Sequence, residues 1–268
     1  MAEKPEESSA GAIQSVAVAF DILEELSRSS APVGVTELAR RLGQTKARVH
    51  RHLANLRSLG FVSQDESSER YQLGWKIYRL GMSVAENFSL RRVAHPHVRR
   101  LSEDTGQTAL MAMPANAEII VIDSVQSSHH IVITVRPGAV IPASSSALGR
   151  AILAFASDDM RKQVLSQPMS RLTESTLVEP ATIEARLAEV REKWYAVAIN
   201  ERLFGIAALA APVFDDHDRL VGAVGLIASQ SAISLDPDPE LVLRVQEAAR
   251  RISAELRSST WDTRRPVA

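Results

Sequence analysis

The sequence predicts an α+β protein of two domains, and three observations support this class. At about 150 residues per domain, the 268 residues correspond to roughly two domains. Apolar residues follow a helical spacing through most of the N-terminal third, whereas the remainder mixes helical and strand-like runs. Two of those runs, 119–125 and 131–135, are short and adjacent, so we expect them to pair antiparallel rather than within a βαβ unit.

The composition is that of an ordinary globular protein. With 45% hydrophobic and 24% charged residues, whole-chain disorder is excluded, and the lack of Cys excludes disulfides, thiolate zinc sites and cysteine nucleophiles. The longest apolar run, 207–213, is far shorter than the roughly 18 residues that span a bilayer. Residues 1–12 have no apolar segment typical of a secretory signal, so we expect a disordered tail. These features predict a soluble, cytoplasmic protein without membrane partners.

The N-terminal third is predicted to contain three helices. Residues 15–27 place Val16, Ala19, Phe20, Leu23 and Leu26 at helical spacing. After a turn rich in Ser, Pro and Gly, Thr36 is expected to cap a short helix that stops at Gly43. A longer helix then starts at Gln44 and Thr45 and ends at Gly60.

A β-hairpin and two further helices are predicted to follow. The strand-like runs 61–63 and 70–73 flank a polar, turn-rich stretch, which is typical of a hairpin. Helical spacing resumes over 74–87 and again over 90–105, where Pro96 is expected to kink or divide the helix.

The rest of the chain is predicted to alternate between strands and helices. We expect strands at 108–113, 119–123, 131–135, 207–214 and 220–227, and helices at 147–156, 158–165, 182–193 and 239–257.

Positive charge gathers on the second and third predicted helices. The whole chain has 31 Lys and Arg against 32 Asp and Glu, a net charge of −1. Residues 28–57, however, include seven basic residues and a single acidic residue, Glu37. His50 and His52 add positive charge when they are protonated. Such segregation is the electrostatic footprint of a protein that binds a phosphate backbone. The seven are Arg28, Arg40, Arg41, Lys46, Arg48, Arg51 and Arg57.

The spacing of this segment predicts a helix-turn-helix motif. If Val49 faces the core, an advance of about 100° per residue keeps Leu53 and Leu56 on the same side and turns the polar residues outward. In this motif the second helix enters the DNA major groove, where Arg can read guanine and Gln or Asn can read adenine. The alternative is a surface helix with solvated charges. The candidate DNA-binding residues are Thr36, Gln44, Thr45, Lys46, Ala47, Arg48, His50, Arg51 and Asn55.

Several motifs, in this order, resemble the isocitrate lyase regulator (IclR) family. In the first domain they are VTELARRLG at 35–43, Lys46, VHR at 49–51, LGFV at 59–62 and YQLG at 71–74. Later motifs are RVAHPH at 92–97, TGQT at 105–108, ALGRA at 147–151, YAV at 195–197 and AAPV at 210–213. The resemblance covers residues 15–256.

The resemblance implies a bacterial transcriptional regulator that forms dimers or tetramers. A linker helix would join its winged helix-turn-helix domain to a GAF-like effector-binding domain with a central antiparallel sheet, and a two-fold dimer would read a palindromic DNA operator. Trp75, Tyr78 and Phe88 would then pack the linker helix against a partner subunit. The expected divisions are a tail at 1–12, the winged domain at 13–74, the linker helix at 75–89, the effector-binding domain at 90–258 and a tail at 259–268.

The resemblance also places a small-molecule pocket in the second domain. Where the glyoxylate- and pyruvate-sensing pattern has an acid, a Cys and a pair of Ser, this chain has Ala198, Ala208, Gly225 and Ile227. A small polar acid would leave buried oxygens unmatched, at about 1–3 kcal/mol each. We therefore expect a partly apolar effector such as an aromatic acid, oriented by His130, Thr134 and Ser145 or Ser146. The alternative is an ordinary core that binds nothing. The positions implied by the resemblance are His130, Ile133, Ile141, Ala147, Leu148, Ala198, Ile206, Ala208, Gly225 and Ile227.

No motif for catalysis, cofactor binding or metal binding stands out. His95 and His97 flank a Pro without a third ligand, while His129 and His130 are adjacent and would point to opposite faces of a strand. There is no nucleophile elbow, P-loop or dinucleotide fingerprint. The sequence thus predicts a ligand-controlled DNA-binding regulator of a catabolic operon. The alternatives are a ligand-independent architectural DNA-binding protein and an enzyme with accessory basic helices.

Overall fold

The computed structural model describes residues 9–87, 89–127 and 133–263, and the chain divides into two compact units. Unit 1 is Met1–Asn87 and unit 2 is Phe88–Ala268. This division lies close to the predicted end of the linker helix 75–89. Among the described residues, no helix is both long and apolar enough to cross a membrane.

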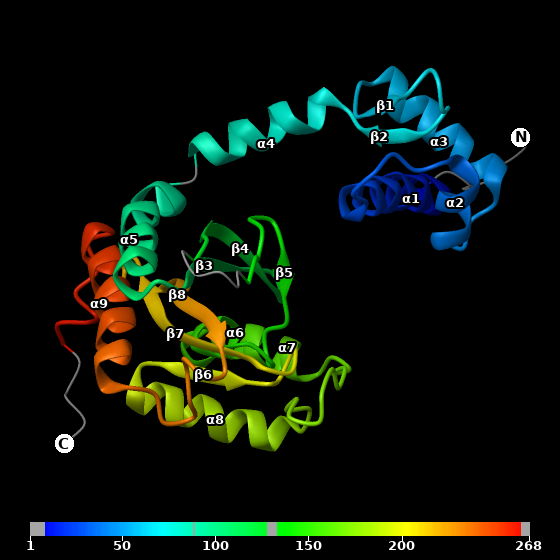
Figure 1. Cartoon of the computed structure of the whole chain (residues 1–268). Helices are drawn as coiled ribbons and strands as arrows, with labels where there is room; N and C mark the ends of the chain where they lie inside the picture. Colours follow the sequence, from blue (N-terminus) through cyan, green and yellow to red (C-terminus); the bar gives the residue numbers. More distant parts are fainter. Residues whose placement is uncertain (1–8, 88, 128–132, 264–268) are drawn as a thin grey trace, which may run out of the picture. The chain divides into compact units, whose positions relative to one another are not determined.

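Unit 1 is a three-helix core followed by a small hairpin and a fourth helix (Figure 1). The fully buried side chains of Ile22, Leu38 and Leu53 join the first three helices into one hydrophobic core. The strands pair antiparallel, so the predicted helix-turn-helix with its wing is confirmed. The elements are α1 (Ser9–Arg28), α2 (Val35–Arg41), α3 (Lys46–Ser58), β1 (Val62–Gln64), β2 (Tyr71–Leu73) and α4 (Trp75–Asn87).

The first helix differs from its prediction in extent and in its buried face. It begins at Ser9, inside the predicted tail 1–12, because small helix-compatible residues precede the apolar stripe. Its fully described core-facing residues include Val18 and Ile22, whereas Val16 and Phe20 are 57% and 61% exposed. Of the predicted stripe, Leu26 is buried and Ala19 and Leu23 pack against the same core, so the core-facing side is shifted by about one residue from Val16 and Phe20.

The predicted capping role of Thr36 is wrong. Helix α2 starts two residues earlier than predicted, at Val35, with Gly34 as its N-cap and no side-chain cap. The reason is a β-bridge in which Val33 and Tyr71 exchange two backbone hydrogen bonds of 2.8 and 2.9 Å. This bridge holds the chain extended up to Gly34, so the helix starts directly after it.

Thr45 and Gly43 set the start of α3. Gly43 has a φ of +61°, a conformation that suits Gly and lets the chain turn sharply between α2 and α3. The Thr45 hydroxyl oxygen accepts a 3.3 Å hydrogen bond from the backbone N–H of Arg48, which caps the helix.

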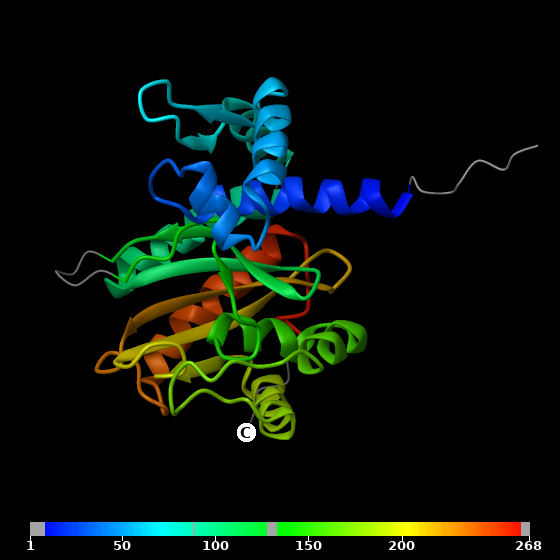
Figure 2. The same cartoon turned by 90° about the vertical axis from the view of Figure 1, so that its right-hand side faces the viewer.

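Unit 2 is a six-stranded antiparallel sheet with helices on both faces (Figures 1 and 2). Its strand order is β5-β4-β3-β8-β7-β6. The strands are β3 (Thr108–Ala115), β4 (Glu118–Val125), β5 (Val140–Ile141), β6 (Ala196–Ile199), β7 (Ile206–Phe214) and β8 (Leu220–Ser229). The helices are α5 (Ser89–Thr105), α6 (Ala147–Phe155), α7 (Asp158–Leu165), α8 (Pro180–Lys193) and α9 (Pro239–Glu255). The α+β class and the central antiparallel sheet are confirmed.

The strand alternation divides unit 2 into two cores. In β7, Ala207 and Leu209 face a core shared with α5 and α9, whereas Ala208 and Ala210 face a core shared with α6 and α8. Side chains that alternate along a strand point to opposite faces, so a single strand supplies both cores. The α6 side is lined by small residues, which leaves room there for a cleft.

The predicted strand at 131–135 is not found. Residues 131–132 lie outside the described residues, and 133–135 belong to no strand. The Thr108 hydroxyl donates a 2.9 Å hydrogen bond to the carbonyl of Ile133, so a side chain rather than a strand ladder holds this segment. β4 instead pairs with β5, whose two residues are too few to show a period of two.

The end of unit 2 is more ordered than expected. Helix α5 runs unbroken past Pro96. Within the predicted tail 259–268, Trp261 is 8% exposed and its indole N–H donates to the carbonyl of Pro212 over 3.2 Å. The Asp218 carboxylate also accepts a 2.6 Å bond from the Thr260 hydroxyl. The tail prediction is therefore wrong for 259–263, because a large apolar ring packs on the sheet; 264–268 lie outside the described residues.

Candidate functional site

The outer face of α3 displays the predicted polar residues. Val49, Leu53 and Leu56 are buried in the core of unit 1, as their spacing predicts. On the opposite side, most candidate residues are exposed, while Gln44 and Arg48 are half-buried. We call the residues of this surface the α3 outer face: Gln44, Thr45, Lys46, Ala47, Arg48, His50, Arg51 and Asn55. Thr36 is also exposed, but it belongs to the first turn of α2.

Part of the positive charge counted in the sequence is neutralised. Arg40 and Arg41 both bind Glu37, at 2.7 and 2.8 Å, and these bonds lower the pKa of Glu37 to about 2. Arg41 also binds Glu25 at 2.8 Å. Because Glu25 lies on α1, outside the 28–57 window, that window overstated the local excess of positive charge.

Three cations of α3 remain available. Within the described part of the chain, the side chains of Lys46, Arg48 and Arg51 make no hydrogen bond or ion pair. His52 adds no comparable charge, because it lies on the core side and its pKa is lowered, first by burial and then by the nearby Arg48 and Arg51. The available positive charge therefore belongs to the first half of α3, the half that a helix-turn-helix motif inserts into the major groove.

The wing between β1 and β2 has an acidic tip. The Asp65 carboxylate accepts bonds from the backbone N–H and hydroxyl groups of Ser67 and Ser68, over 2.6 to 3.2 Å, and these lower its pKa to about 2. Asp65, Glu66 and Glu69 are all exposed. The wing tip consequently does not extend the positive surface of α3, and a wing contact to phosphates stays a prediction.

A cleft in unit 2 gathers most of the predicted effector-binding residues. It lies between the N-terminal end of α6 and the α6 side of the sheet, and its cavity volume is about 60 Å³. Leu110, Val135 and Leu226 add to its apolar lining. We call it the α6 cleft. The predicted residues that line it are Ile141, Ser145, Ser146, Ala147, Leu148, Ala198, Ile206, Ala208 and Ile227.

Four predicted residues do not line this cleft as described. His130 lies outside the described residues. Thr134 is exposed, and Ile133 is held through its carbonyl by Thr108. Gly225 lies in β8, where a Cβ atom would stand 2.4 Å from the Leu209 carbonyl oxygen, so its position reflects a close backbone approach.

The two serines at the start of α6 differ in their bonding. The Ser146 hydroxyl donates to the carbonyl of Pro142 over 2.6 Å and accepts from the N–H of Gly149 over 3.1 Å, which caps α6. Ser145 is only 3% exposed, yet its hydroxyl has no hydrogen-bond partner among the residues that the structure describes. Ser146 is therefore occupied by the protein, whereas Ser145 retains its bonding capacity within the cleft.

A buried ion pair fixes one wall of the α6 cleft. Arg150 and Glu201 are 2% and 7% exposed and are joined by two bonds of 2.7 and 2.6 Å. Arg150 also donates to the carbonyls of Ser144 and Val197, so it ties the α6 loop to β6. The sequence analysis missed this pair, although an Arg inside the otherwise apolar 147–156 helix was a signal that it needed a partner.

Arg202, at the mouth of the cleft, was also missed. It follows Glu201 in the loop between β6 and β7, where the carbonyl of Glu201 accepts a 2.6 Å bond from the Thr176 hydroxyl. Arg202 lines the α6 cleft and the depression next to it. Nothing in its sequence context distinguishes it from a solvated loop Arg, so only the fold reveals its place.

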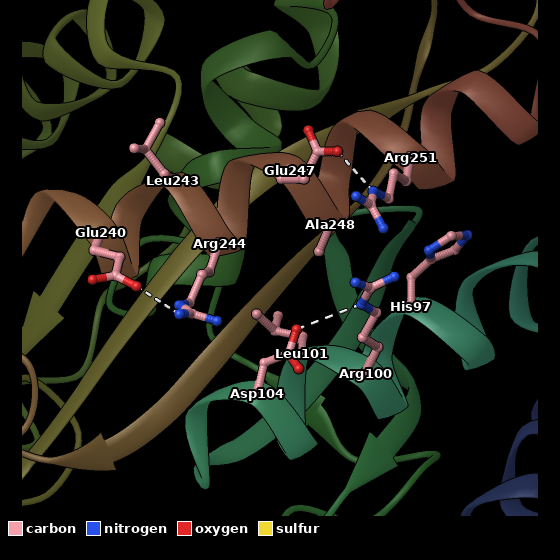
Figure 3. A pocket seen from close by; sticks show the side chains of 10 residues that line it. All are labelled: His97, Arg100, Leu101, Asp104, Glu240, Leu243, Arg244, Glu247, Ala248 and Arg251. Atoms are coloured by element: carbon pink, nitrogen blue, oxygen red, sulfur yellow. Dashed lines mark hydrogen bonds and ion pairs between the residues drawn. The ribbon is translucent and has the colours of Figure 1, made fainter.

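A second groove, between α5 and α9, has a different character (Figure 3). Its charged groups pair with one another: Arg244 binds Glu240 at 2.5 Å, and Arg251 binds Glu247 at 2.7 Å. Leu243 is 63% exposed at its edge. Since these charges are already satisfied, the groove offers little to a small charged ligand.

The histidines of the HPH motif have separate partners. Nδ1 of His95 lies 2.8 Å from a carboxylate oxygen of Asp123, and Nε2 of His97 lies 2.7 Å from one of Glu255. This supports structural roles rather than a shared metal. Among the described residues, the group with metal-compatible spacing is Asp215, Asp216 and His217, an exposed turn after β7.

Comparisons with known proteins agree with both units. Residues 15–66 match the IclR helix-turn-helix domain, and residues 82–254 match the family described as bacterial transcriptional regulator IclR, C-terminal. The transcriptional repressor IclR of Escherichia coli K12 is 30% identical over 246 residues, covering 91% of this chain and 90% of that protein.

Solved structures show the same fold. An IclR transcriptional regulator from Alicyclobacillus acidocaldarius matches with a TM-score of 0.78 and 30% identity, covering 92% of this chain and 98% of that one. An IclR homologue from Microbacterium hydrocarbonoxydans, solved with 4-hydroxybenzoate, matches with a TM-score of 0.78 and 21% identity over 91% of this chain and 99% of that one. The chain therefore belongs to the IclR family of bacterial DNA-binding transcriptional regulators and is not an enzyme.

Proposed function

We propose that this regulator controls a catabolic operon and senses a small aromatic carboxylic acid in the α6 cleft. The observation that carries this proposal is the lining of the cleft, which combines apolar walls at Leu110, Ile141 and Ile227 with polar groups at one end. Ligand sites are mostly apolar, with a few placed polar groups that fix orientation. The apolar walls suit an aromatic ring, and the polar end suits a carboxylate.

The small residues of the cleft floor support the same ligand class. Ala198 and Ala208 present only methyl groups to the cleft and offer no hydrogen bond to a second set of oxygens. A compact polar acid such as glyoxylate would lose hydrogen bonds to water there, at about 1–3 kcal/mol per unmatched group. The Microbacterium homologue, which was solved with 4-hydroxybenzoate, offers a precedent within the same fold.

Isothermal titration calorimetry and thermal unfolding with benzoate, 4-hydroxybenzoate, glyoxylate and pyruvate test this proposal. We expect an aromatic acid to bind and to raise the unfolding temperature, since a ligand at 100 times its Kd stabilises the native state by about 2.7 kcal/mol. Ala208→Val narrows the cleft. It should reduce the binding free energy of the aromatic acid by more than it changes the unfolding free energy of the free protein. Tight binding of glyoxylate or pyruvate without any aromatic acid would overturn the proposal.

We also propose that two copies pair through unit 1. Trp75 and Tyr78 stack on each other with ring centroids 4.7 Å apart, yet are 70% and 56% exposed, and Leu80 of the same helix is 52% exposed. Phe20 on α1 is 61% exposed as well. Large apolar side chains exposed in this number favour a surface that is covered by a partner subunit. A two-fold dimer would present two α3 helices to a palindrome with half-sites about 34 Å apart.

Signalling would require the effector to favour one arrangement of the paired units. A ligand shifts a conformational equilibrium only by its difference in affinity for the two states, so the acid must bind one spacing of the two α3 helices more tightly. We propose that α4 transmits this change. Small-angle scattering of the protein with and without the bound acid should show different spacings; identical profiles would contradict this mechanism.

The ligand-independent alternative remains separable by experiment. An architectural DNA-binding protein would show the same operator affinity at every concentration of every acid.

Sedimentation of a Trp75→Ser and Tyr78→Ser double variant tests the pairing independently of any ligand. We expect this variant to shift toward monomer. A double variant with the native assembly would remove α4 from the proposed interface.

A further inference from the structure

We infer that Arg202 and Ser145 together bind the carboxylate of an anionic effector at the mouth of the α6 cleft, with the apolar part of the ligand directed inward. This inference deepens the proposed function and rests on the α6 cleft as the effector site. It assigns a role to two residues on different segments, the loop after β6 and the loop before α6, which the fold brings to one end of the cleft.

The first support is the position of Arg202. Arg202 and Ser145 line both the α6 cleft and the adjoining depression. Of the other residues that line these two hollows, Ile141 alone is shared by both. A cation and a hydroxyl therefore both line the place where the two hollows adjoin.

The second support is that neither group is used by the protein. Within the described ranges, the Arg202 guanidinium has no ion pair or hydrogen bond, in contrast to Arg150, which binds Glu201 through two bonds. Ser145 is only 3% exposed, and its hydroxyl makes no hydrogen bond with any described residue. The Ser145 hydroxyl is therefore free to bond a ligand that enters the cleft, because no described group of the protein uses it.

The third support is the surroundings of Arg202. Nearby protein partly desolvates its guanidinium, which lowers its pKa although the side chain reaches solvent. Two carboxylates line these hollows: that of Glu201 is already neutralised by Arg150, and that of Glu118 belongs to an exposed residue of the adjoining depression and does not line the α6 cleft. A carboxylate placed beside Arg202 would restore the interactions that the desolvated cation has lost, and Arg suits the flat geometry of a carboxylate.

The loop that carries Arg202 is held at its base. The N–H of Asn200 donates to the carbonyl of Ile206 over 2.8 Å, and the Asn200 side-chain oxygen accepts from the N–H of Gly205 over 2.7 Å. The carbonyl of Glu201 accepts from Thr176. Arg202 thus projects from an anchored turn, so its guanidinium is held near the cleft at a reduced cost in conformational entropy.

Calorimetric titration of the full chain with two probes tests the inference. The probes are 4-hydroxybenzoate and 4-hydroxybenzamide, its uncharged amide counterpart, with pyruvate as an aliphatic acid. The wild-type protein should prefer the acid over the amide. Arg202→Gln should lower the affinity for the acid by about 10- to 100-fold, the size expected for a hydrogen bond to a charged group. The affinity for the amide should stay unchanged.

Three further variants separate charge from shape. Arg202→Lys keeps the charge without the planar fork and should restore part of the affinity. Ser145→Ala should weaken the acid by about 2- to 10-fold. Arg92→Gln removes an exposed Arg from α5, which packs on the other face of the sheet, and should bind like the wild type. A purely structural role for Arg202 would weaken the acid and the amide equally.

Each result has a distinct meaning. Wild-type affinity of Arg202→Gln for 4-hydroxybenzoate would overturn the role of Arg202 and leave the aromatic effector standing. Binding of pyruvate alone, lost in Arg202→Gln, would support Arg202 and overturn the aromatic effector. A wild-type protein that binds none of the three probes would overturn both.

Discussion

The arginines of α3 and those of α9 differ in what they bind. On α9, Arg244, Arg250 and Arg251 each bind a Glu of the same helix at 2.5 to 2.8 Å. On α3, Arg48 and Arg51 bind no described acidic residue, although both helices are amphipathic and present Arg to their outer surfaces.

This difference teaches that an Arg-rich sequence is not in itself a binding surface. An Arg that is followed or preceded by Glu at helical spacing forms a local pair and contributes little outside its own helix. The α3 segment has no acid at such spacing, so its positive charge is directed outward. Arg202, like the α3 arginines, has no ion pair among the described residues, whereas Arg150 is paired with Glu201 of a distant segment.

The largest effect should come from breaking the buried pair. Arg150→Met leaves the Glu201 carboxylate buried without a partner, which costs about 3–5 kcal/mol. Urea unfolding of unit 2 measures this loss. The double variant Arg150→Met and Glu201→Leu should recover most of the stability, because it removes both charges; a double variant as unstable as the single one would contradict this explanation.

Removal of the unpaired cations of α3 should affect DNA binding and not stability. Arg48→Ala or Arg51→Ala should lose about 1–3 kcal/mol of specific binding if the side chain reads a base. Lys46→Ala should weaken binding to all DNA sequences alike and reduce the salt dependence of the affinity by about one counterion. Fluorescence anisotropy across a salt series distinguishes these outcomes. Unchanged operator affinity in the Arg48 and Arg51 double variant would remove α3 from the interface.

The helix caps allow a matched comparison between the units. Thr45 caps α3 and Ser157 caps α7, each by accepting a 3.3 Å bond from the third following backbone N–H. Replacement of either by Ala should cost about 1 kcal/mol of stability, measured by thermal unfolding. Only Thr45→Ala should also weaken DNA binding, because α3 carries the available cations. Equal loss of DNA affinity in Ser157→Ala would show a general stability effect.

The smallest effect should come from the paired surface charges of α9. Bonds from Arg250 and then Arg251 lower the pKa of Glu247 to about 2, from an ordinary value near 4.5. A carboxyl whose pKa is lower in the folded state stabilises the protein above the unfolded pKa, and this contribution is lost as the pH falls from about 4.5 to 2.

Glu247→Gln should therefore flatten the loss of stability over this range of acid pH and change little at pH 7. Since the side chain is 39% exposed, solvent screening limits the effect to about 1 kcal/mol or less. Urea midpoints of the wild type and the variant at pH 5, 4, 3 and 2.5 would measure it. If the urea midpoint of Glu247→Gln falls with pH as steeply as that of the wild type, the loss of stability in acid comes from other carboxylates.

The sequence predicted those parts of the fold that depend on local patterns. Val49, Leu53 and Leu56 follow a helical period, and seven residues that line the α6 cleft are positions implied by the family resemblance. It could not predict the contacts between distant segments. Arg150 and Glu201 are 51 positions apart, and the pairing of Glu25 with Arg41 depends on how α1 lies against α2. The two-residue strand β5 was too short for any periodic signal.

The small side chains of the cleft floor have an evolutionary consequence. Ala198 and Ala208 already carry single methyl groups, so most replacements at these positions add volume and only Gly reduces it. Under the proposed function, a lineage that starts from this protein could narrow its effector specificity by adding methyl groups on strands β6 and β7. Such changes lie in a unit separate from α3, so the metabolite that is sensed could diverge while the operator stays the same.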